Sequence, residues 1–216
     1  MKEILIINPV STEYFNKLTI DYLQDKKLKE NRIFAVNTKD GPDSIETFED
    51  EIKAGPFILK LVEDNKDKFD AIIINCFADP VINAAREISH IPIIGPGQAS
   101  MAAAMCLAKK FAIISIYKKS GPWGELQAKQ AGTSSMLVYS TGIEVPVLEL
   151  EKDPDRTKTE IIREASFAIE KKGAEVIILG CTGMAPIAQA IKEELGITVI
   201  EPMLTALKTA EMLLQI

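Results

Sequence analysis

The segment AEVIILGCTGMAPIAQAIK at 174–192 decides the fold when it is set against DAIIINCFADPVINAAREI at 70–88. Each segment runs from an acidic residue through an apolar stretch to a cysteine, a short loop with a proline and a helical pattern. A second apolar stretch ending at a proline follows each, at 91–96 and 197–202, and an apolar helical pattern comes next. Chance similarity between two buried strand–loop–helix units is the alternative, but repetition over four consecutive elements favours an internal duplication.

Runs rich in Ile and Val alternate with helical patterns along the chain, and nearly all are continuously apolar. Such runs are typical of parallel strands covered by helices on both faces. The sequence therefore predicts the α/β class, with two similar doubly wound, Rossmann-like lobes at 1–95 and 96–201. The expected strands are Glu3–Asn8, Arg32–Val36, Ala71–Asn75, Ile93–Ile94, Ala112–Tyr117, Val145–Leu148, Glu175–Gly180 and Val199–Ile200, and the expected helices are Thr12–Gln24, Glu46–Asn65, Pro80–Ile88, Ser100–Lys109, Pro154–Lys172, Pro186–Leu195 and Leu204–Leu214.

Composition excludes several classes of function. A formal net charge of −6 argues against nucleic-acid binding, which needs a basic face. No apolar run reaches the roughly 20 residues of a membrane span, and the first residues do not resemble a secretory signal. Three cysteines without CxxC spacing indicate neither a disulfide framework nor a zinc knuckle, so we expect a reducing, cytoplasmic setting. The chain has only one histidine, His90, so a multi-histidine metal site is excluded and no metal is expected. His90 itself is interpreted as structural.

Two of the cysteines follow apolar strands and precede helical patterns. Ligands collect beyond the carboxyl ends of the strands in open α/β sheets, which is where Cys76 and Cys181 are expected. We expect Pro80 to begin one helix with Asp79 as its N-cap, and Pro186 to begin the other. Free N–H groups near a helix start attract anions and lower the pKa of a thiol.

A pseudo-twofold relation between the lobes would place the active site in the cleft between them, with the two sulfurs flanking it. A thiolate could then remove the proton α to a carbonyl while a thiol returns one to the opposite face, with no metal or organic cofactor. A lone cysteine is more often a small buried hydrophobe, but two at matched strand ends favour chemistry. We interpret Cys106 as such a core residue, on a buried helix capped by Ser100.

Four stretches together resemble the hydantoin and allantoin racemases of the Asp/Glu racemase superfamily. They are INPVST at 7–12, SIETFEDEIKAGPFILK at 44–60, INCFADPVINAAREI at 74–88 followed by IPIIGPGQAS, and ILGCTGMAP at 178–186. They occur in the family's order and span nearly the whole chain.

The resemblance implies two α/β lobes with the active site between them, the first completed by a C-terminal helix within 202–216. It also implies a homo-oligomer that acts on a small molecule and that binds neither nucleic acid nor membrane. Cys76 and Cys181 match the two catalytic cysteines. The positions that match or lie near the substrate pocket are Asn8, Pro9, Ser11, Thr12, Phe77, Ala78, Ser115, Thr182, Gly183 and Met184.

Several positions have other interpretations. Asn8 could cap a turn, and Ser11 and Thr12 could cap the following helix. Gly121, Pro122 and Trp123 are interpreted as a loop. Gln98 replaces an acidic residue that is frequent in hydantoin racemases, and Ile116 and the 201–203 turn also depart from the family pattern, which weakens the case for hydantoin itself.

The main hypothesis is a cofactor-independent racemase or epimerase for a hydantoin or allantoin-like ring. An aspartate- or glutamate-type racemase is the first alternative. A maleate-type cis–trans isomerase, in which one cysteine attacks covalently, is the second. A two-lobed small-ligand-binding module without catalysis is the alternative from another class.

Overall fold

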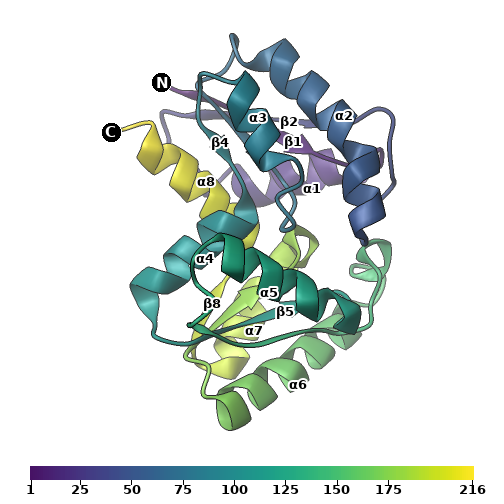
Figure 1. Cartoon of the computed structure of the whole chain (residues 1–216), viewed down its shortest axis with the longest axis vertical. Helices are drawn as coiled ribbons and strands as arrows, with labels where there is room; N and C mark the ends of the chain where they lie inside the picture. The colour runs from purple at the N-terminus through teal and green to yellow at the C-terminus, as the bar shows by residue number, and fades with distance from the viewer. The chain divides into compact units, whose positions relative to one another are not determined.

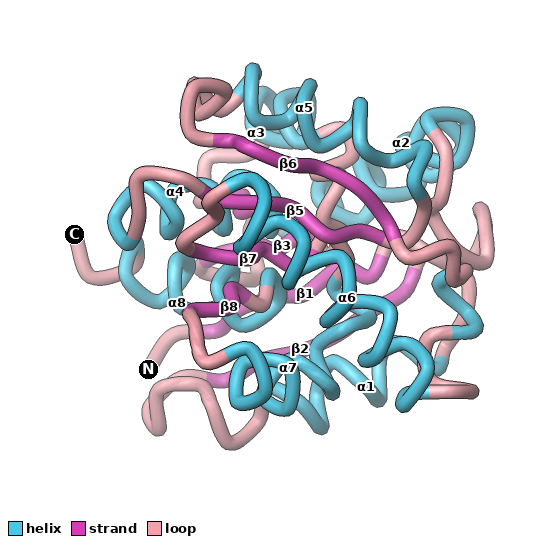
Figure 2. The backbone as a smooth tube through the Cα atoms, turned by 90° about the horizontal axis from the view of Figure 1, so that it is seen from below, coloured by secondary structure: helices cyan, strands magenta, loops and turns pink.

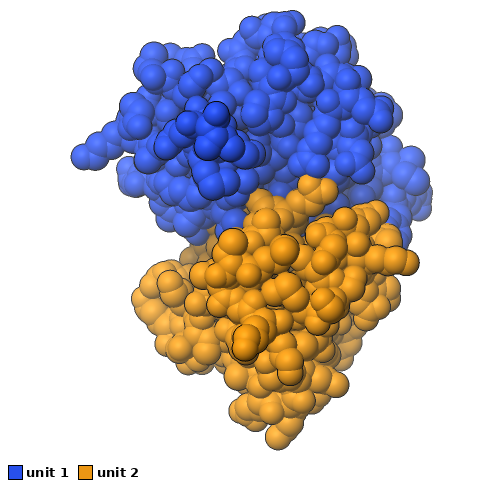
Figure 3. Space-filling model, turned by 60° about the vertical axis from the view of Figure 1, so that its left-hand side comes forward, with its two compact units in different colours: residues 1–96, 203–216 blue, residues 97–202 orange.

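The computed structural model describes all 216 residues, and its chain divides into two compact units. The first lobe comprises residues 1–96 and 203–216, and the second comprises 97–202 (Figure 3). Each lobe contains one four-stranded parallel sheet with helices around it (Figure 1). The predicted α/β class with two similar lobes is confirmed.

The first lobe has the strand order β2-β1-β3-β4. The chain crosses to one side of β1 through α1 and returns to the other side through α2 and α3, so right-handed crossovers place α1 on the opposite face of the sheet from α2 and α3. Figure 2 shows this layering. The elements are β1 Glu3–Asn8, α1 Tyr14–Leu23, β2 Arg32–Asn37, α2 Phe48–Asn65, β3 Ala71–Ile74, α3 Ile82–Ile88, β4 Ile93–Ile94 and, at the end of the chain, α8 Pro202–Leu213.

The second lobe repeats this order as β6-β5-β7-β8. Helix α5 follows its first strand as α1 does in the first lobe, while α6 and α7 pack on each other as α2 and α3 do. The equal order agrees with the internal duplication predicted from the sequence. The elements are α4 Pro96–Leu107, β5 Phe111–Ser115, α5 Gly121–Gln130, β6 Leu137–Gly142, α6 Pro154–Lys172, β7 Val176–Leu179, α7 Ala188–Leu195 and β8 Thr198–Ile200, with 3₁₀ turns η1 Lys118–Ser120, η2 Val147–Glu149 and η3 Thr182–Ile187.

Central strands supply the core of each lobe. In β3 every residue is buried, and the same holds for β5 and β7. Burying one such Ile or Leu side chain contributes about 1.5–3 kcal/mol. The buried strands hold the carboxyl ends of β1, β3, β5 and β7 in fixed register within each sheet. No helix of the chain combines the length and apolar character needed to cross a membrane.

The expected strand Val145–Leu148 is wrong, and the fourth strand of the second lobe is β6. Its sequence, LVYSTG, has no continuous apolar run, and its first four residues are only half-buried, because β6 lies at the edge of the sheet. The VPVL segment lacks a backbone donor at Pro146 and turns into η2 instead. The expected loop at Gly121–Trp123 is also wrong, because these residues begin α5.

Helix α4 begins at Pro96 rather than after Ser100, so the predicted cap by Ser100 is wrong. Ser100 is instead a residue within the helix, and its side chain is buried. Cys106 is exposed, which contradicts the expected core position. Met101 and Ala104 face the interior. Cys106 follows Ala104 by two residues, which is about 200° around a helix of 3.6 residues per turn, so its side chain points to the surface.

The last helix, α8, is bound to the rest of the first lobe by the buried carboxylate of Glu211. Glu211 is only 3% exposed, and its Oε1 accepts from the backbone N–H of Leu28 at 2.6 Å and from Asn31 Nδ2 at 3.4 Å. Its Oε2 accepts from Lys208 Nζ at 2.9 Å, and Lys208 also donates to the Lys26 carbonyl. The buried face of α8 is therefore part of the core of the first lobe.

Replacing Glu211 by alanine is expected to lower the free energy of unfolding by about 1–3 kcal/mol, because the buried Asn31 amide and the half-buried Leu28 N–H lose their acceptor. Urea denaturation followed by circular dichroism measures the change. Asp21→Ala, which breaks an exposed ion pair with Lys17 on α1, serves as the control and should cost under about 1 kcal/mol. Equal losses in the two variants would contradict the role given to Glu211.

Candidate active site

Each sheet has a topological switch point, where the chain leaves two neighbouring strands in opposite directions. In the first lobe it lies between β1 and β3, and in the second between β5 and β7. Ligands of open α/β sheets bind outside the carboxyl ends of the strands at such points. Cys76 stands two residues after the last residue of β3, and Cys181 two residues after the last residue of β7.

Equivalent backbone hydrogen bonds, one in each lobe, place the two cysteines. The N–H of Asn75 donates to the Ile7 carbonyl at 2.8 Å, and the N–H of Gly180 donates to the Ile114 carbonyl at 2.7 Å. Each bond extends the pairing of its two central strands by one residue, and the cysteine follows. Both side chains are half-buried and neither forms a disulfide. The structure thus gives each lobe one thiol at an equivalent position.

The Cys76 loop is a tight turn rather than a helix start. The Asp79 N–H donates to the Cys76 carbonyl at 3.1 Å, and Asp79 and Val81 both adopt left-handed backbone conformations, with φ of 53° and 50°. Helix α3 begins only at Ile82, without a side-chain cap, so the expected cap by Asp79 and start at Pro80 are wrong. A left-handed residue before the helix separates it from the cysteine. Of the predicted contacts, Phe77 is buried and Ala78 half-buried.

The Cys181 loop leads directly into the 3₁₀ turn η3. Cys181 is extended, with φ of −153°, and its carbonyl accepts from the Met184 N–H at 3.1 Å. That N–H is therefore engaged within the loop, and the Met184 side chain lies in the core of the second lobe. Pro186 lies inside η3, while α7 starts at Ala188, so the expected helix start at Pro186 is wrong.

Gly183 lies against the second cysteine. A Cβ on Gly183 would stand 3.5 Å from Cys181 Sγ and 3.1 Å from Leu150 Cδ1, so any larger residue would fill the space beside the sulfur. Thr182, which precedes Gly183 in the chain, is buried. Gly183 also lines a pocket of about 210 Å³ with Leu150, Glu151, Pro154, Pro186 and Ile187.

Asn8 is the centre of a buried amide network. Its Oδ1 accepts from Thr19 Oγ1 at 3.2 Å and from Asn75 Nδ2 at 2.8 Å, and its Nδ2 donates to Asn16 Oδ1 at 3.0 Å. The network ties α1 to the residue that precedes Cys76. Asn8 is 2% exposed, and the neighbouring Pro9 is also buried.

Ser11 and Thr12 do not cap α1, so that alternative is wrong. Helix α1 begins at Tyr14 without a side-chain cap. Ser11 Oγ instead donates to the Asp43 carboxylate, and Thr12 Oγ1 to the Asp43 carbonyl at 3.0 Å. The two hydroxyls hold the loop after β1 against the loop after β2.

In the second lobe Ser115 occupies the position that Asn8 has in the first. It ends β5, is 7% exposed, and its Oγ donates to the Gly180 carbonyl at 3.1 Å. The hydroxyl thus fixes the residue immediately before Cys181, as the Asn8 amide fixes Asn75.

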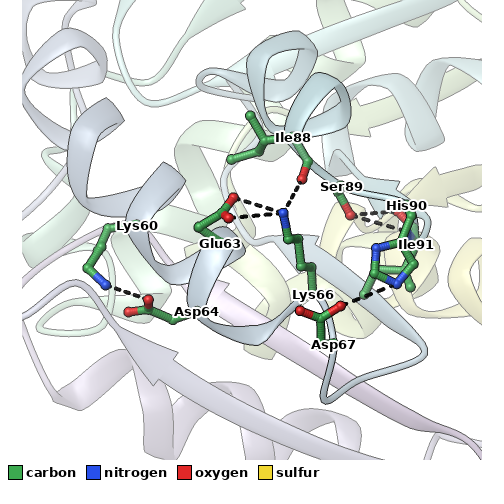
Figure 4. Close-up of polar contacts among 9 residues, drawn as sticks. All are labelled: Lys60, Glu63, Asp64, Lys66, Asp67, Ile88, Ser89, His90 and Ile91. Carbon is green, nitrogen blue, oxygen red and sulfur yellow. Dashed lines mark hydrogen bonds and ion pairs between the residues drawn. The ribbon is translucent and has the colours of Figure 1, made fainter.

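His90 lies at the amino-terminal end of the strands of the first sheet, whereas Cys76 lies at their carboxyl end. His90 precedes β4, whereas Cys76 follows the parallel strand β3. Figure 4 shows it in the surface segment where Lys66 binds the Ile88 carbonyl and Glu63, with His90 Nε2 3.7 Å from Asp67 Oδ1. The structural interpretation of His90 agrees with this position. No group of three or more His, Cys, Asp or Glu side chains in the chain is arranged to hold a metal ion.

Glu51 is a titratable residue beside the first cysteine loop that the sequence did not single out. Burial, followed by the negative charge of Asp79, raises the pKa of Glu51 to about 7. Carboxyl groups with raised pKa values concentrate at functional sites. In the sequence, Glu51 stands one helical turn before Gly55 on the expected helix, which places both residues on one helix face. Only the folded structure shows that this face packs on the Cys76 loop.

Comparison with known proteins agrees with this geometry. Residues 4–210 match the family described as Asp/Glu/Hydantoin racemase. The chain is 34% identical to the hydantoin racemase of Rhizobium meliloti over 97% of this chain and 87% of the relative. It is 30% identical to that of Pseudomonas sp. strain NS671 over 97% and 84%. The structure of allantoin racemase from Klebsiella pneumoniae superposes with a TM-score of 0.94 at 28% identity, covering 100% of this chain and 88% of that one. With a cysteine at the switch point of each lobe and a family match over almost its whole length, the chain belongs to the Asp/Glu/hydantoin racemase family, whose members are isomerases.

Proposed function

We propose that the chain is a cofactor-independent racemase that inverts the carbon α to a carbonyl in a hydantoin or allantoin-like ring. Cys76 and Cys181 act as its base and acid. The observation that carries the proposal is the equivalent position of the two thiols at the switch points of two lobes with the same strand order. A cysteine that served only to fill the core of one lobe would not be expected at the same position, after the same strand-end hydrogen bond, in the other lobe.

The chemistry is a balanced proton exchange. One cysteine, as thiolate, takes the α-proton and becomes a thiol, and the electron pair of the C–H bond passes into an enolate. The other cysteine, as thiol, protonates the opposite face of the carbon and becomes a thiolate. Hydrogen-bond donors of the Phe77–Ala78 and Thr182–Gly183 segments stabilise the charge on the enolate oxygen, and each turnover exchanges the protonation states of the two sulfurs.

A ring ureide suits this pair of bases better than a free amino acid does. Its α-proton is more acidic, and it brings no carboxylate that would repel a thiolate. The hydantoin and allantoin racemases that the chain resembles support the same choice. Asn8 and Ser115 fix the residue before each cysteine, and the Pro9–Thr12 loop, held against Asp43, completes the proposed substrate surroundings.

The thiols must stay reduced, so a reducing, cytoplasmic setting belongs to the proposal. A homo-oligomer does too, and light scattering coupled to size exclusion measures it directly.

A substrate panel in heavy water tests the function. The panel contains single enantiomers of 5-methylhydantoin, 5-benzylhydantoin, allantoin, aspartate and glutamate, followed by proton NMR and by optical rotation. We expect deuterium to enter the α-position and rotation to decay for one or more ring compounds, while the free amino acids remain unchanged. Samples without protein correct for spontaneous racemisation of the rings. Exchange of aspartate or glutamate alone would transfer the function to amino-acid racemisation, and no exchange with any compound would overturn the proposal.

A further inference from the structure

Helix α4, labelled in Figure 1, is the only α-helix of the chain without a charged residue. Residues 96–108 contain no Asp, Glu, Lys or Arg, although 26% of the whole chain is charged. A helix that is apolar on all sides is normally buried on all sides. In the single chain, however, only part of α4 is covered.

One side of α4 packs within the second lobe. Met101 is 1% exposed and Ala104 is fully buried. The Thr133 hydroxyl, which follows α5, donates to Met101 Sδ at 3.7 Å. Ser100 is buried as well. This side therefore has its partners inside the chain, and it fixes which residues the helix turns outward.

The opposite side of α4 is exposed and apolar. Ala102, Met105 and Cys106 have the i, i+3, i+4 spacing that places side chains on one helix face, and all three are exposed. Met105 is 53% exposed, and Leu107, which ends the helix, is 57% exposed. We call these four residues the α4 face. Methionine enrichment and the absence of charge are typical of the buried centre of a protein–protein interface.

Other exposed apolar side chains of the chain stand among charges. Ile52 of α2 lies between Glu51 and Lys53 in the sequence. Phe167 of α6 has Lys172 Nζ over its ring, 5.8 Å from the centroid. Such mixed surfaces are ordinary solvated helix faces. The α4 face lacks these charges.

The charge pattern indicates a second copy of the chain as the occupant. Two copies with a net charge of −6 repel each other, and a twofold contact brings every side chain near the axis against its own counterpart. The uncharged α4 face avoids such like-charge contacts, and it offers no complementary charge to an acidic or basic partner. The nearest charges along the chain are Lys109 and Lys110. In an antiparallel pair these lysines lie at opposite ends of a helix about 18 Å long.

We propose that two copies of the chain associate through their α4 faces, as an antiparallel helix pair about a twofold axis. The contact names the surface of the homo-oligomer included in the proposed function, but it does not depend on the reaction. The face of so short a helix is small compared with the roughly 1,200 Å² of a standard interface. We therefore expect a dimer that dissociates at micromolar concentrations.

Sedimentation velocity of the intact chain from about 1 to 200 μM tests the dimer. The wild type should change from monomer to dimer over this range, whereas Met105→Lys should raise the Kd at least about 100-fold, because it buries like charges in the contact. Met105 is exposed in the single chain, so folding is unaffected, and circular dichroism checks this. Met212→Lys on α8 is the matched control, because Met212 is 56% exposed on another apolar helix, and it should dimerise as the wild type does.

A monomeric wild type at every concentration would overturn the dimer and leave the racemase proposal to its own test in heavy water. Unchanged association of Met105→Lys would place the contact elsewhere and would also overturn the proposal. Equal weakening by Met105→Lys and Met212→Lys would attribute the effect to net charge rather than to α4.

Mixing two variants tests the twofold arrangement. Met105→Lys and Met105→Glu should each remain monomeric alone, whereas an equal mixture should form dimers because opposite charges then meet across the axis. A mixture that stays monomeric would contradict a contact of the face with its own copy.

Cross-linking through Cys106 gives a readout that needs no further change to the α4 face. In the Cys76→Ser/Cys181→Ser background Cys106 is the only thiol. A bismaleimide with a two-carbon bridge should then produce a covalent dimer on a denaturing gel, and additional replacement of Cys106 by serine should abolish it. A dimer in sedimentation that gives no cross-link at Cys106 would overturn the α4 contact.

Discussion

Replacement of Cys76 or Cys181 by serine is expected to reduce racemisation by a factor on the order of 10³ or more. General acid–base catalysis by a positioned group contributes about 10²–10⁴-fold, and a serine hydroxyl is far too weak an acid to supply the anion that a thiol supplies near neutral pH. Serine nearly preserves the size of cysteine, so folding is unaffected. Decay of optical rotation of a ring compound measures the loss for each variant.

Exchange should be lost less completely than racemisation. In each single variant the remaining thiolate can still remove the α-proton of one enantiomer and return a deuteron to the same face. We therefore expect α-deuteration of one enantiomer in Cys76→Ser and of the other in Cys181→Ser. Cys106→Ser is the control, because Cys106 is exposed on α4, and its activity should equal that of the wild type. Full racemisation in either of the first two variants would remove that cysteine from the mechanism.

Gly180→Ala is expected to separate the central strands of the second lobe beside Cys181. A Cβ on Gly180 would stand 2.7 Å from Ser115 Cβ and 2.9 Å from Ser115 Cα, so β5 or β7 must shift. Such overpacking costs about 1–3 kcal/mol of folding free energy. A displacement near 1 Å at a catalytic group can cost about 10²-fold in rate. Chemical denaturation and kcat on a ring compound measure the two effects.

Gly196→Ala distinguishes the loss of position from the loss of stability. Gly196 caps α7 with φ of +65°, and a Cβ added at this glycine would have no neighbouring atom within 4 Å. Alanine there costs about 1–2 kcal/mol through backbone conformation alone. We expect this variant to be destabilised yet to turn over at the wild-type rate. A similar loss of kcat in both variants would show that Gly180 acts only through stability.

The apolar runs were sufficient to predict most of the fold. The strands β1 and β4 and the helix α6 have the bounds expected from their residues. Buried parallel strands are continuously apolar because helices cover both faces, so they are distinct in a sequence. The same property located Cys76 and Cys181, since a strand end is visible where the apolar run stops.

Edge and surface features were less predictable. Strand β6 is half-buried, so its sequence lacks the apolar run of a central strand. Helix α5 begins Gly-Pro, which is as typical of a loop as of a first helical turn. Cys106 has apolar neighbours on both sides in the sequence, and only the rotation of α4 decides which of them face the core.

The environment of the Cys76 loop depended on contacts far apart in the sequence. Glu51, Asp79 and Gly95 come from a helix, a turn and the end of a strand, and no local pattern links them. Left-handed backbone at Val81 is equally hidden, because a β-branched residue rarely adopts it. The sequence therefore identified Cys76, whereas the residues that pack around its loop could be identified only in the folded structure.

The position of α8 has a consequence for synthesis on the ribosome. The first lobe begins at residue 1, yet its core includes Met203, Ala206, Leu207 and Ala210, and the buried Glu211 binds the turn at Leu28. The second lobe comprises residues 97–202. Residues 1–96 therefore leave the ribosome before the second lobe, but the core of the first lobe stays incomplete until α8 has followed the second lobe.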